Sequence, residues 1–223
     1  MDGETPTRRV RVWDFPTRLF HWALVALLVA AYVTAESGEL EWHLRAGYCV
    51  LALLLFRVVW GFVGSDTARF SHFVRGPRAV WHHLRGFFGS APDVAVGHNP
   101  AGGWAVLAIL LVLCVQVGTG LFADDDISEA GPFAQYVERP TRRFLSGLHD
   151  QSFNVLLGLA ALHVAAIVAY WVVRRHNLVW PMVTGVKRLP AALVAPRLRR
   201  PVVAGVIFVV AAWVAAWVAS LDG

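Results

Sequence analysis

The sequence predicts an all-α integral membrane protein, in which a bundle of four transmembrane helices is followed by a fifth, C-terminal transmembrane helix. Hydrophobic residues make up 57% of the 223 residues and charged residues only 16%, too few to cover a water-facing surface. Five apolar runs are each long enough to cross a hydrocarbon core of about 30 Å as a helix. The runs are continuously apolar and do not alternate, which favours helices over the strands of a barrel.

The five runs cover residues 19–35, 46–64, 104–123, 153–173 and 202–221. They divide the chain into a cytoplasmic N-terminal segment (1–18), a four-helix membrane domain (19–173), a basic cytoplasmic connector (174–200) and a C-terminal transmembrane helix (201–223). We expect the first helix to begin near Pro16, whose ring suits a first turn. Residues 77–88 predict a short interfacial helix, because Trp81 and Leu84 share a face beside Arg78 and Arg85. The last run has no ionisable side chain and predicts a packing helix.

Basic and acidic connections alternate along the chain. Arginine is abundant before the first run, between the second and third, and between the fourth and fifth, whereas the other two connections are mainly acidic. The positive-inside rule therefore predicts a cytoplasmic N-terminus and a periplasmic C-terminus. The net charge of +5 reflects this orientation, and we expect no nucleic-acid partner. A cleaved signal peptide ending at Val33-Thr34-Ala35 is the alternative for the first run, but Asp14 and His21 suit one poorly.

Four of the nine histidines lie inside the apolar runs or at their ends, where an ionisable group is costly and marks a functional site. His149 and His163 are 14 residues apart on the fourth helix. This is close to four whole turns, so both rings share one face, about 21 Å apart along the axis. One zinc or copper ion cannot use both, because its ligands converge within a few ångströms. Two cofactors at different depths fit this spacing.

Each of these two histidines has a partner at the same depth. His43 lies at the outer end of the second helix, as His149 lies at the outer end of the fourth, and His21 lies on the inner half of the first helix, as does His163. Each pair predicts a clamp on one iron, with a haem macrocycle between the helices. A hydrogen-bonded core histidine is the alternative for His163. No Cys-x-x-Cys-His sequence is present, which excludes covalent haem attachment.

Two further residues are candidates for the inner site. His98 precedes the third helix and is expected to contact a haem propionate or to bind a quinone; it is also the substitute ligand if His21 is not one. Arg57 lies in the inner part of the second helix, where a buried guanidinium favours an anion such as a propionate. The alternative for Arg57 is snorkelling to the surface. Cys49 and Cys114 lie in apolar runs and are expected to be buried packing residues.

Several motifs resemble one known family, in the same order along the chain. They are Arg18-Leu19-Phe20-His21-Trp22, the segment 57–64, Gly97-His98-Asn99-Pro100, Thr119-Gly120-Leu121-Phe122 with Asp125-Asp126-Ile127, and Leu148-His149-Asp150 through His163. Over roughly residues 10–190 the chain resembles the prokaryotic cytochrome b561 family, which includes the b-type cytochrome subunits of nickel–iron hydrogenases. The resemblance implies a four-helix dihaem bundle in the bacterial cytoplasmic membrane. It also implies two haem b groups, with His43 and His149 as the outer ligand pair and His21 and His163 as the inner pair.

The resemblance further implies electron transfer between the quinone pool and a redox partner, either hydrogenase-like or a c-type cytochrome. Two histidines per iron leave no open coordination site, so we expect an electron-transfer subunit of an oxidoreductase and not a self-sufficient enzyme. A stand-alone quinone-linked enzyme that oxidises superoxide is one alternative; its basic outer funnel has only Arg139, Arg142 and Arg143 available. A histidine-bearing transporter is another, but the third helix offers only Gln116 and Thr119 along such a path.

Overall fold

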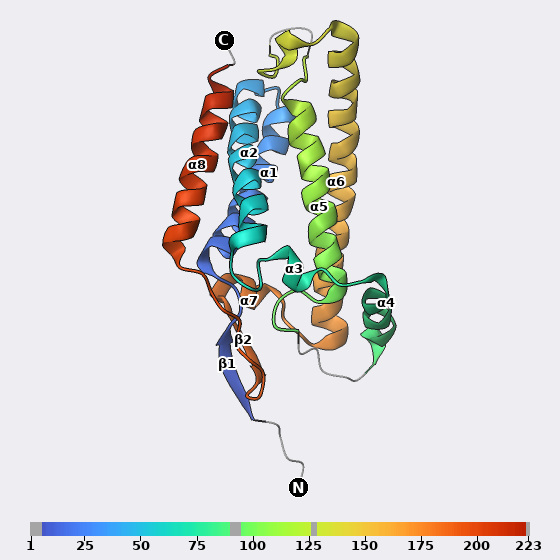
Figure 1. The fold of residues 1–223 in the computed structure, drawn as a ribbon. Helices are drawn as coiled ribbons and strands as arrows, with labels where there is room; N and C mark the ends of the chain where they lie inside the picture. Colours follow the sequence, from blue (N-terminus) through green and yellow to red (C-terminus); the bar gives the residue numbers. More distant parts are fainter. Residues whose placement is uncertain (1–5, 90–94, 126–128, 222–223) are drawn as a thin grey trace.

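The computed structural model describes residues 6–89, 95–125 and 129–221. Part of the Asp125-Asp126-Ile127 motif therefore lies outside the described residues. Within these ranges, five helices are long and apolar enough to cross a membrane: α1 (Phe15–Glu36), α2 (Leu40–Val63), α5 (Pro100–Gly120), α6 (Arg139–Arg174) and α8 (Pro201–Ala219). They run side by side, and the described chain begins and finishes at opposite ends of the bundle (Figure 1). The predicted all-α membrane fold with a fifth helix is confirmed.

The shorter elements gather mainly at the end of the bundle where α1 begins, which we call the inner end. They are β1 (Thr7–Arg11), α3 (Phe70–Phe73), α4 (Pro77–Arg85), η1 (Gly86–Phe88), α7 (Val179–Thr184) and β2 (Val186–Pro190), whereas η2 (Ala134–Tyr136) lies at the opposite, outer end (Figure 1). Strands β1 and β2 pair antiparallel, with Arg9 opposite Arg188. This sheet joins the N-terminal segment to the connector that precedes α8, a pairing that the sequence analysis did not predict.

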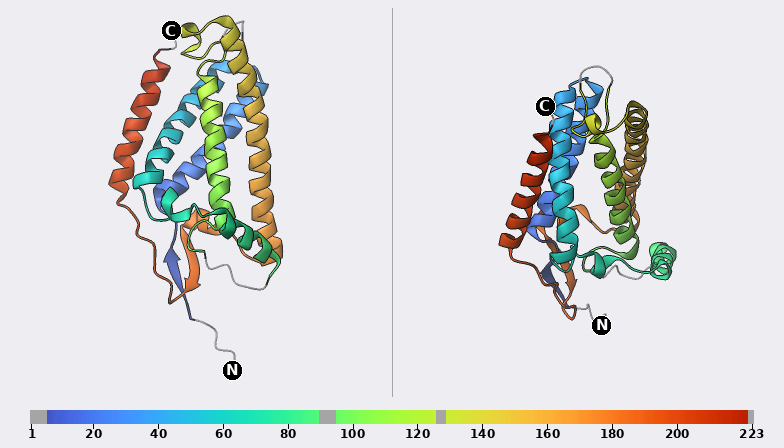
Figure 2. Two further views of the ribbon diagram at one scale, coloured as in Figure 1. Left: turned by 45° about the vertical axis from the view of Figure 1, so that its right-hand side comes forward. Right: turned by 45° about the horizontal axis from the view of Figure 1, so that its top comes forward.

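The central helix of the bundle is α2, which packs along α1 on one side and along α8 on another. Helix α5 packs along α6 and meets α2, while α6 makes few contacts with α1 or α2. The bundle therefore consists of two helix pairs, α1 with α2 and α5 with α6, which are joined mainly between α2 and α5 (Figure 2). Against α2, helix α8 buries Ala204, Ala211 and Ala215, and its Phe208 ring meets Phe56 edge-on at 6.2 Å. Small residues allow this close approach of two membrane helices.

Local sequence explains where several helices begin. The Asp14 carboxylate accepts a hydrogen bond from the Thr17 amide at 2.7 Å, which caps α1, and Pro16 stands in the first turn as predicted. Asn99 caps α5 in the same way, because its Oδ1 accepts from the Gly102 amide at 2.7 Å. Each side chain satisfies a backbone donor that the first turn of a helix leaves unpaired. Between α1 and α2, Gly38 adopts a φ of 75°, which favours glycine.

Two expectations from the sequence were wrong. Helix α6 begins at Arg139 and not near residue 153, so His149 lies inside the helix and does not open it. The preceding residues are polar, and a helix that extends beyond the hydrocarbon core keeps them in water. Cys49 and Cys114 are exposed on the sides of their helices. Both lie on membrane-spanning helices, where an outward side chain meets lipid, and an apolar lipid environment suits a small hydrophobe as well as a protein core does.

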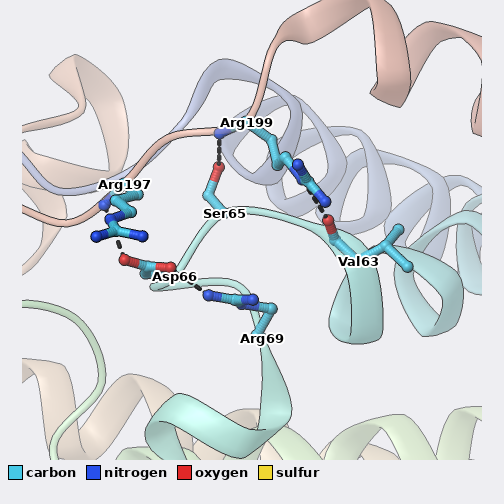
Figure 3. A network of polar contacts seen from close by, with 6 residues as sticks. All are labelled: Val63, Ser65, Asp66, Arg69, Arg197 and Arg199. Carbon is cyan, nitrogen blue, oxygen red and sulfur yellow. Dashed lines mark hydrogen bonds and ion pairs between the residues drawn. The ribbon is translucent and has the colours of Figure 1, made fainter.

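The connector before α8 is tied to the loop that follows α2 (Figure 3). The backbone of Asp66 donates to the Arg197 carbonyl at 3.0 Å, and the Arg197 amide donates to the Asp66 carboxylate at 2.9 Å. The Arg199 amide donates to Ser65 Oγ at 2.9 Å, and its Nε donates to the Val63 carbonyl at 3.1 Å. Arg69 also pairs with Asp66. We call these contacts the connector clamp; they hold the start of α8 against the inner end of α2.

Candidate functional site

The outer histidine pair joins His43 on α2 to His149 on α6, and their ring centroids lie 6.1 Å apart. The Nδ1 atom of His43 lies 2.8 Å from the Ala31 carbonyl oxygen, and Nδ1 of His149 lies 2.8 Å from the Gln116 carbonyl oxygen. Because a carbonyl oxygen can only accept, each Nδ1 carries the hydrogen and each Nε2 keeps a lone pair. Backbone carbonyls orient metal-binding histidines in this way.

The side chain of Gln116 also reaches this pair. Its amide nitrogen lies 3.0 Å from Nε2 of His149, and Ser152 Oγ donates to its amide oxygen at 2.5 Å. A metal ion bound at that Nε2 would replace the amide hydrogen bond, so Gln116 must turn aside when His149 is a ligand. Gln116 and Ser152 could not be predicted as residues of a cofactor site from the sequence, because their contacts depend on how α5 and α6 pack together.

Gly120 lets the His149 ring lie against α5. A Cβ atom at Gly120 would stand 2.8 Å from Cε1 and 3.1 Å from Nδ1 of His149. Contacts this short force a shift of the ring, so any larger residue displaces His149 from its present position. A Cβ atom at Gly118, two residues earlier on the same helix, would meet nothing within 4 Å. The absence of a side chain at Gly120 is therefore part of the outer site.

The inner histidine pair joins His21 on α1 to His163 on α6, with ring centroids 6.4 Å apart. The Nδ1 atom of His21 is buried, and it has no hydrogen-bond partner among the described residues. The ring of Trp22 meets the His21 ring edge-on at 4.9 Å. His21 thus lacks the backbone carbonyl partner that holds both outer histidines, and packing is what orients it.

Both ring separations suit one metal ion between two imidazoles. With a metal–nitrogen bond of about 2 Å on each side, the centroids of two opposed imidazoles stand about 6 Å apart. The observed 6.1 and 6.4 Å fit this arrangement. Among the residues that the structure describes, no group of three or more histidine, cysteine, aspartate or glutamate side chains could hold a metal ion. Pairs alone fit an iron whose other four ligands come from a macrocycle.

Helix α6 contributes one histidine to each pair, and helices α1 and α2 contribute the others. The helical rise separates His149 from His163 by about 21 Å, so the two pairs belong to two centres. Helix α6 makes few contacts with α1 or α2, and between the depths of the two histidine pairs Tyr32 of α1 stacks on Phe153 of α6 with ring centroids 5.5 Å apart. The residues present therefore fit two groups of the haem type.

Arg57 lies on the inner half of α2 and is only 3% exposed, so the snorkelling alternative is wrong. Its guanidinium lies over the Phe70 ring, 5.1 Å from the centroid, and its Nη1 has no hydrogen-bond partner among the described residues. The nearby Asp14 accepts a hydrogen bond from Trp60 Nε1 at 3.3 Å. Arg57 thus keeps one buried donor for an anion.

His98 lies at the inner end, just before α5. Its ring packs between Trp13 and Phe73, with centroid distances of 4.7 and 4.6 Å. Although the residue as a whole is half-buried, its Nδ1 is fully buried and has no hydrogen-bond partner within the described ranges. Burial, together with the nearby charges of Arg57 and the two inner histidines, lowers the pKa of His98 to about 3. The imidazole is therefore neutral at pH 7, with one nitrogen available to a ligand.

A sequence model of the prokaryotic cytochrome b561 family matches residues 12–185, which include all four paired histidines. The chain belongs to the prokaryotic cytochrome b561 family. A prokaryotic cytochrome b561 is a b-type cytochrome, which implies haem b as its cofactor, and the protein is a multi-pass membrane protein that transfers electrons.

Curated relatives of this cytochrome b561 are described as probable Ni/Fe-hydrogenase B-type cytochrome subunits. The relative from Azotobacter vinelandii is 29% identical over 151 residues, which cover 55% of this chain and 63% of the relative. The relative from Bradyrhizobium diazoefficiens is 21% identical over 209 residues, which cover 79% of this chain and 85% of the relative. The chain thus spans slightly less than two thirds of the first relative's length, and a longer stretch of the second at lower identity.

Proposed function

We propose that this cytochrome b561 is a dihaem electron-transfer subunit that links a hydrogenase-like partner to the quinone pool. The proposal rests on two histidine pairs at two depths of α6. Their ring centroids lie 6.1 Å apart in the outer pair and 6.4 Å apart in the inner pair. When bound, two haem b groups supply one-electron transfer between these depths. The hydrogenase-like partner is suggested by the relatives, which are named as hydrogenase cytochrome subunits.

The side chains have separate roles in this proposal. His43 and His149 bind the outer iron through Nε2, while their Nδ1 hydrogens are held by backbone carbonyls. His21 and His163 bind the inner iron. Arg57 offers its buried Nη1 to a haem propionate, and neutral His98 offers its Nδ1 to a quinone oxygen at the inner end. A haem propionate remains the second candidate ligand for His98. If His98 binds quinone, its loss should affect quinone reduction alone, whereas if it binds a propionate, its loss should also affect the inner haem.

The orientation is also a proposal. The inner end carries the arginines of β1, α4, β2 and the connector clamp, which supports a cytoplasmic position under the positive-inside rule. The N-terminus then lies in the cytoplasm, the C-terminus lies in the periplasm, and the outer haem faces a periplasmic partner. The four parts of the chain are the N-terminal segment, the four-helix haem-binding domain, the basic connector and the C-terminal helix.

The first test is the haem count. Pyridine haemochrome analysis of the full-length protein should find two haem b groups per chain, and reduced-minus-oxidised spectra should resolve two midpoint potentials. His43→Ala and His149→Ala should each remove the same haem, and His21→Ala and His163→Ala should each remove the other. His72→Ala, an exposed histidine outside the bundle, is the control and should keep both. One haem per chain, or two members of a pair removing different haems, would refute the pairing.

The partner and the quinone need their own measurement. In membranes that contain the hydrogenase, hydrogen should reduce the cytochrome, and added quinone should reoxidise it. His98→Ala should raise the KM for quinone several-fold while both haems remain. If hydrogen reduces no haem although both are present, the hydrogenase-like assignment fails and a c-type cytochrome partner is tested next.

The alternative function, a stand-alone enzyme that oxidises superoxide, would need a basic surface at the outer end. Arg142, one of three arginines available for a basic funnel, pairs with Asp124 at 2.6 Å. An anion at this surface therefore meets a neutralised pair, so steering by Arg142 is weakened. A purified protein that reduces quinone with superoxide, in the absence of any partner, would restore this alternative.

A further inference from the structure

We propose that α4 is a membrane-interface helix whose arginines bind anionic phospholipid headgroups at the inner surface. The proposal concerns a surface that electron transfer does not use. It rests on the three faces of the nine-residue helix α4 and the η1 turn that continues it, each of which has a different neighbour. One face packs on the bundle, one is exposed and apolar, and one is exposed and basic.

The first face fixes α4 to the bundle. His83 Nε2 lies 2.6 Å from the Tyr170 hydroxyl of α6, and the Phe87 ring meets the Tyr170 ring at 5.2 Å. The same hydroxyl accepts a hydrogen bond from Asn99 Nδ2 at 2.8 Å. Tyr170 is 7% exposed, so these contacts form a buried joint between α4, α5 and α6. The position of α4 beside the membrane helices is therefore set by specific contacts.

A second contact sets the depth of α4. Trp104, in the first turns of α5, donates its indole Nε1 hydrogen to the Arg75 carbonyl at 2.8 Å, immediately before α4. Trp104 is 47% exposed. A half-exposed tryptophan with a bonded N–H is typical of the membrane–water boundary. Helix α4 lies beside the inner ends of α5 and α6 in Figure 1.

The second face of α4 is apolar and uncovered. Trp81, Leu84 and Phe88 follow one another at helical spacing and are 55%, 51% and 84% exposed. Three large exposed apolar side chains within eight residues are unfavourable in water. Beside a bundle that spans a bilayer, the acyl-chain boundary covers such a face, as it covers other amphipathic surface helices.

The third face is basic. Arg78, His82 and Arg85 are exposed and occupy one side of the helix, and the Arg85 guanidinium lies over the Trp81 ring at 4.4 Å. Residues 67–88 contain four arginines and three histidines but no acidic residue. Within the described part of the chain, no carboxylate pairs with Arg78 or Arg85. The charge that complements this face is negative, and at the surface of a bilayer it belongs to phospholipid phosphates.

The test uses the full-length, haem-loaded protein. Binding of phosphatidylglycerol is titrated by native mass spectrometry for the wild type, for Arg78→Gln with Arg85→Gln, and for Arg9→Gln with Arg188→Gln. The last variant removes two charges from the same end of the protein, on the β1–β2 sheet. Each arginine near a membrane surface contributes about fivefold to anionic lipid binding, so the α4 variant should bind about 25-fold more weakly, and the sheet variant should bind like the wild type.

A second measurement tests the apolar face. The protein is placed in nanodiscs made with phospholipids brominated on their acyl chains, which quench nearby tryptophans. Tryptophan fluorescence of the wild type should lose more intensity than that of Trp81→Phe, and the difference should equal the contribution of one interfacial tryptophan. Equal loss of lipid binding in the α4 and sheet variants would overturn the proposal, because general charge would explain it. Absence of Trp81 quenching at any lipid composition would also overturn it and would assign the face to a protein partner.

Discussion

A Cβ atom placed on Gly120 would lie 2.8 Å from Cε1 of His149, so the outer histidine occupies space that any other residue would fill. Gly120→Ala should therefore displace the His149 ring and weaken or abolish binding of one haem while leaving the other. Gly118→Ala is the matched control, because a Cβ atom there meets nothing within 4 Å. Haem content and the reduced spectrum measure the effect. Equal haem content in the two variants would contradict the assigned role of Gly120.

Arg57 provides the second prediction. Replacing Arg57 by Gln removes a buried positive charge from the inner half of the bundle, which should lower the midpoint potential of the inner haem by tens of millivolts, roughly, because the oxidised, more positive iron is then favoured. Redox titration of both haems checks this result. The outer haem, at the other depth, should shift much less. A shift confined to the outer haem would show that Arg57 is assigned to the wrong site.

The connector clamp predicts a dependence on pH. Partial burial opposes ionisation of Asp66, but hydrogen bonds from Arg197 and Arg69 outweigh it, so the pKa of Asp66 is lowered. A carboxylate whose pKa is lower in the folded state stabilises the fold at neutral pH, and this stabilisation is lost as the pH falls through the folded pKa. Because the ordinary value is about 3.9, we expect the clamp to weaken only below about pH 4.

Asp66→Asn tests the same clamp at neutral pH. The substitution removes the charge, so a trypsin-like protease should cut after Arg197 or Arg199 faster than in the wild type, as peptide mapping would detect. The expected local loss is about 1 kcal/mol, as for hydrogen bonds to a partly exposed charged group. Arg9→Gln, outside the clamp, serves as the control. Unchanged cleavage in Asp66→Asn would show that packing of α8 on α2 holds the connector without the clamp.

Tyr170 provides the fourth prediction. Tyr170→Phe keeps the ring that packs on Phe87 but removes the hydroxyl that joins His83 to Asn99. We expect α4 to loosen by about 1–2 kcal/mol, seen as faster amide hydrogen exchange over residues 77–88. Tyr136→Phe, at an exposed position of the outer end, should leave this exchange unchanged. Equal exchange in the two variants would mean that the hydroxyl contributes nothing to the attachment of α4.

The membrane helices were predictable because the bilayer itself imposes a length and an apolar composition on each span. Their ends were harder to predict, since α6 continues as a helix past the apolar run, from Arg139. No hydropathy pattern reports a helix that extends into water. Sheet β1–β2 was not predicted, for a different reason. Thr7–Arg11 contains three arginines and has no strand pattern of its own, and it is extended because it pairs with β2.

The histidine pairs followed from depth and spacing, because a helix converts sequence separation directly into position along the bundle. In the structure the ring centroids of each predicted pair lie no more than 6.4 Å apart, while the role of these histidines as haem ligands stays a prediction. Gly120, Gln116 and Ser152 were not predicted as site residues. Their importance depends on which side of α5 faces His149, and this follows from helix packing, which the sequence pattern alone does not reveal.

The pairing of β1 with β2 also has a consequence for the order of assembly. Val10 emerges from the ribosome long before its partner Lys187, so β1 must wait while four membrane helices are made and inserted. At ordinary rates of synthesis this delay is on the order of ten to forty seconds. Trp13, which follows β1 and packs on His98, therefore closes the inner end late. Before that, the His98 ring lacks Trp13 on one of its two packed sides.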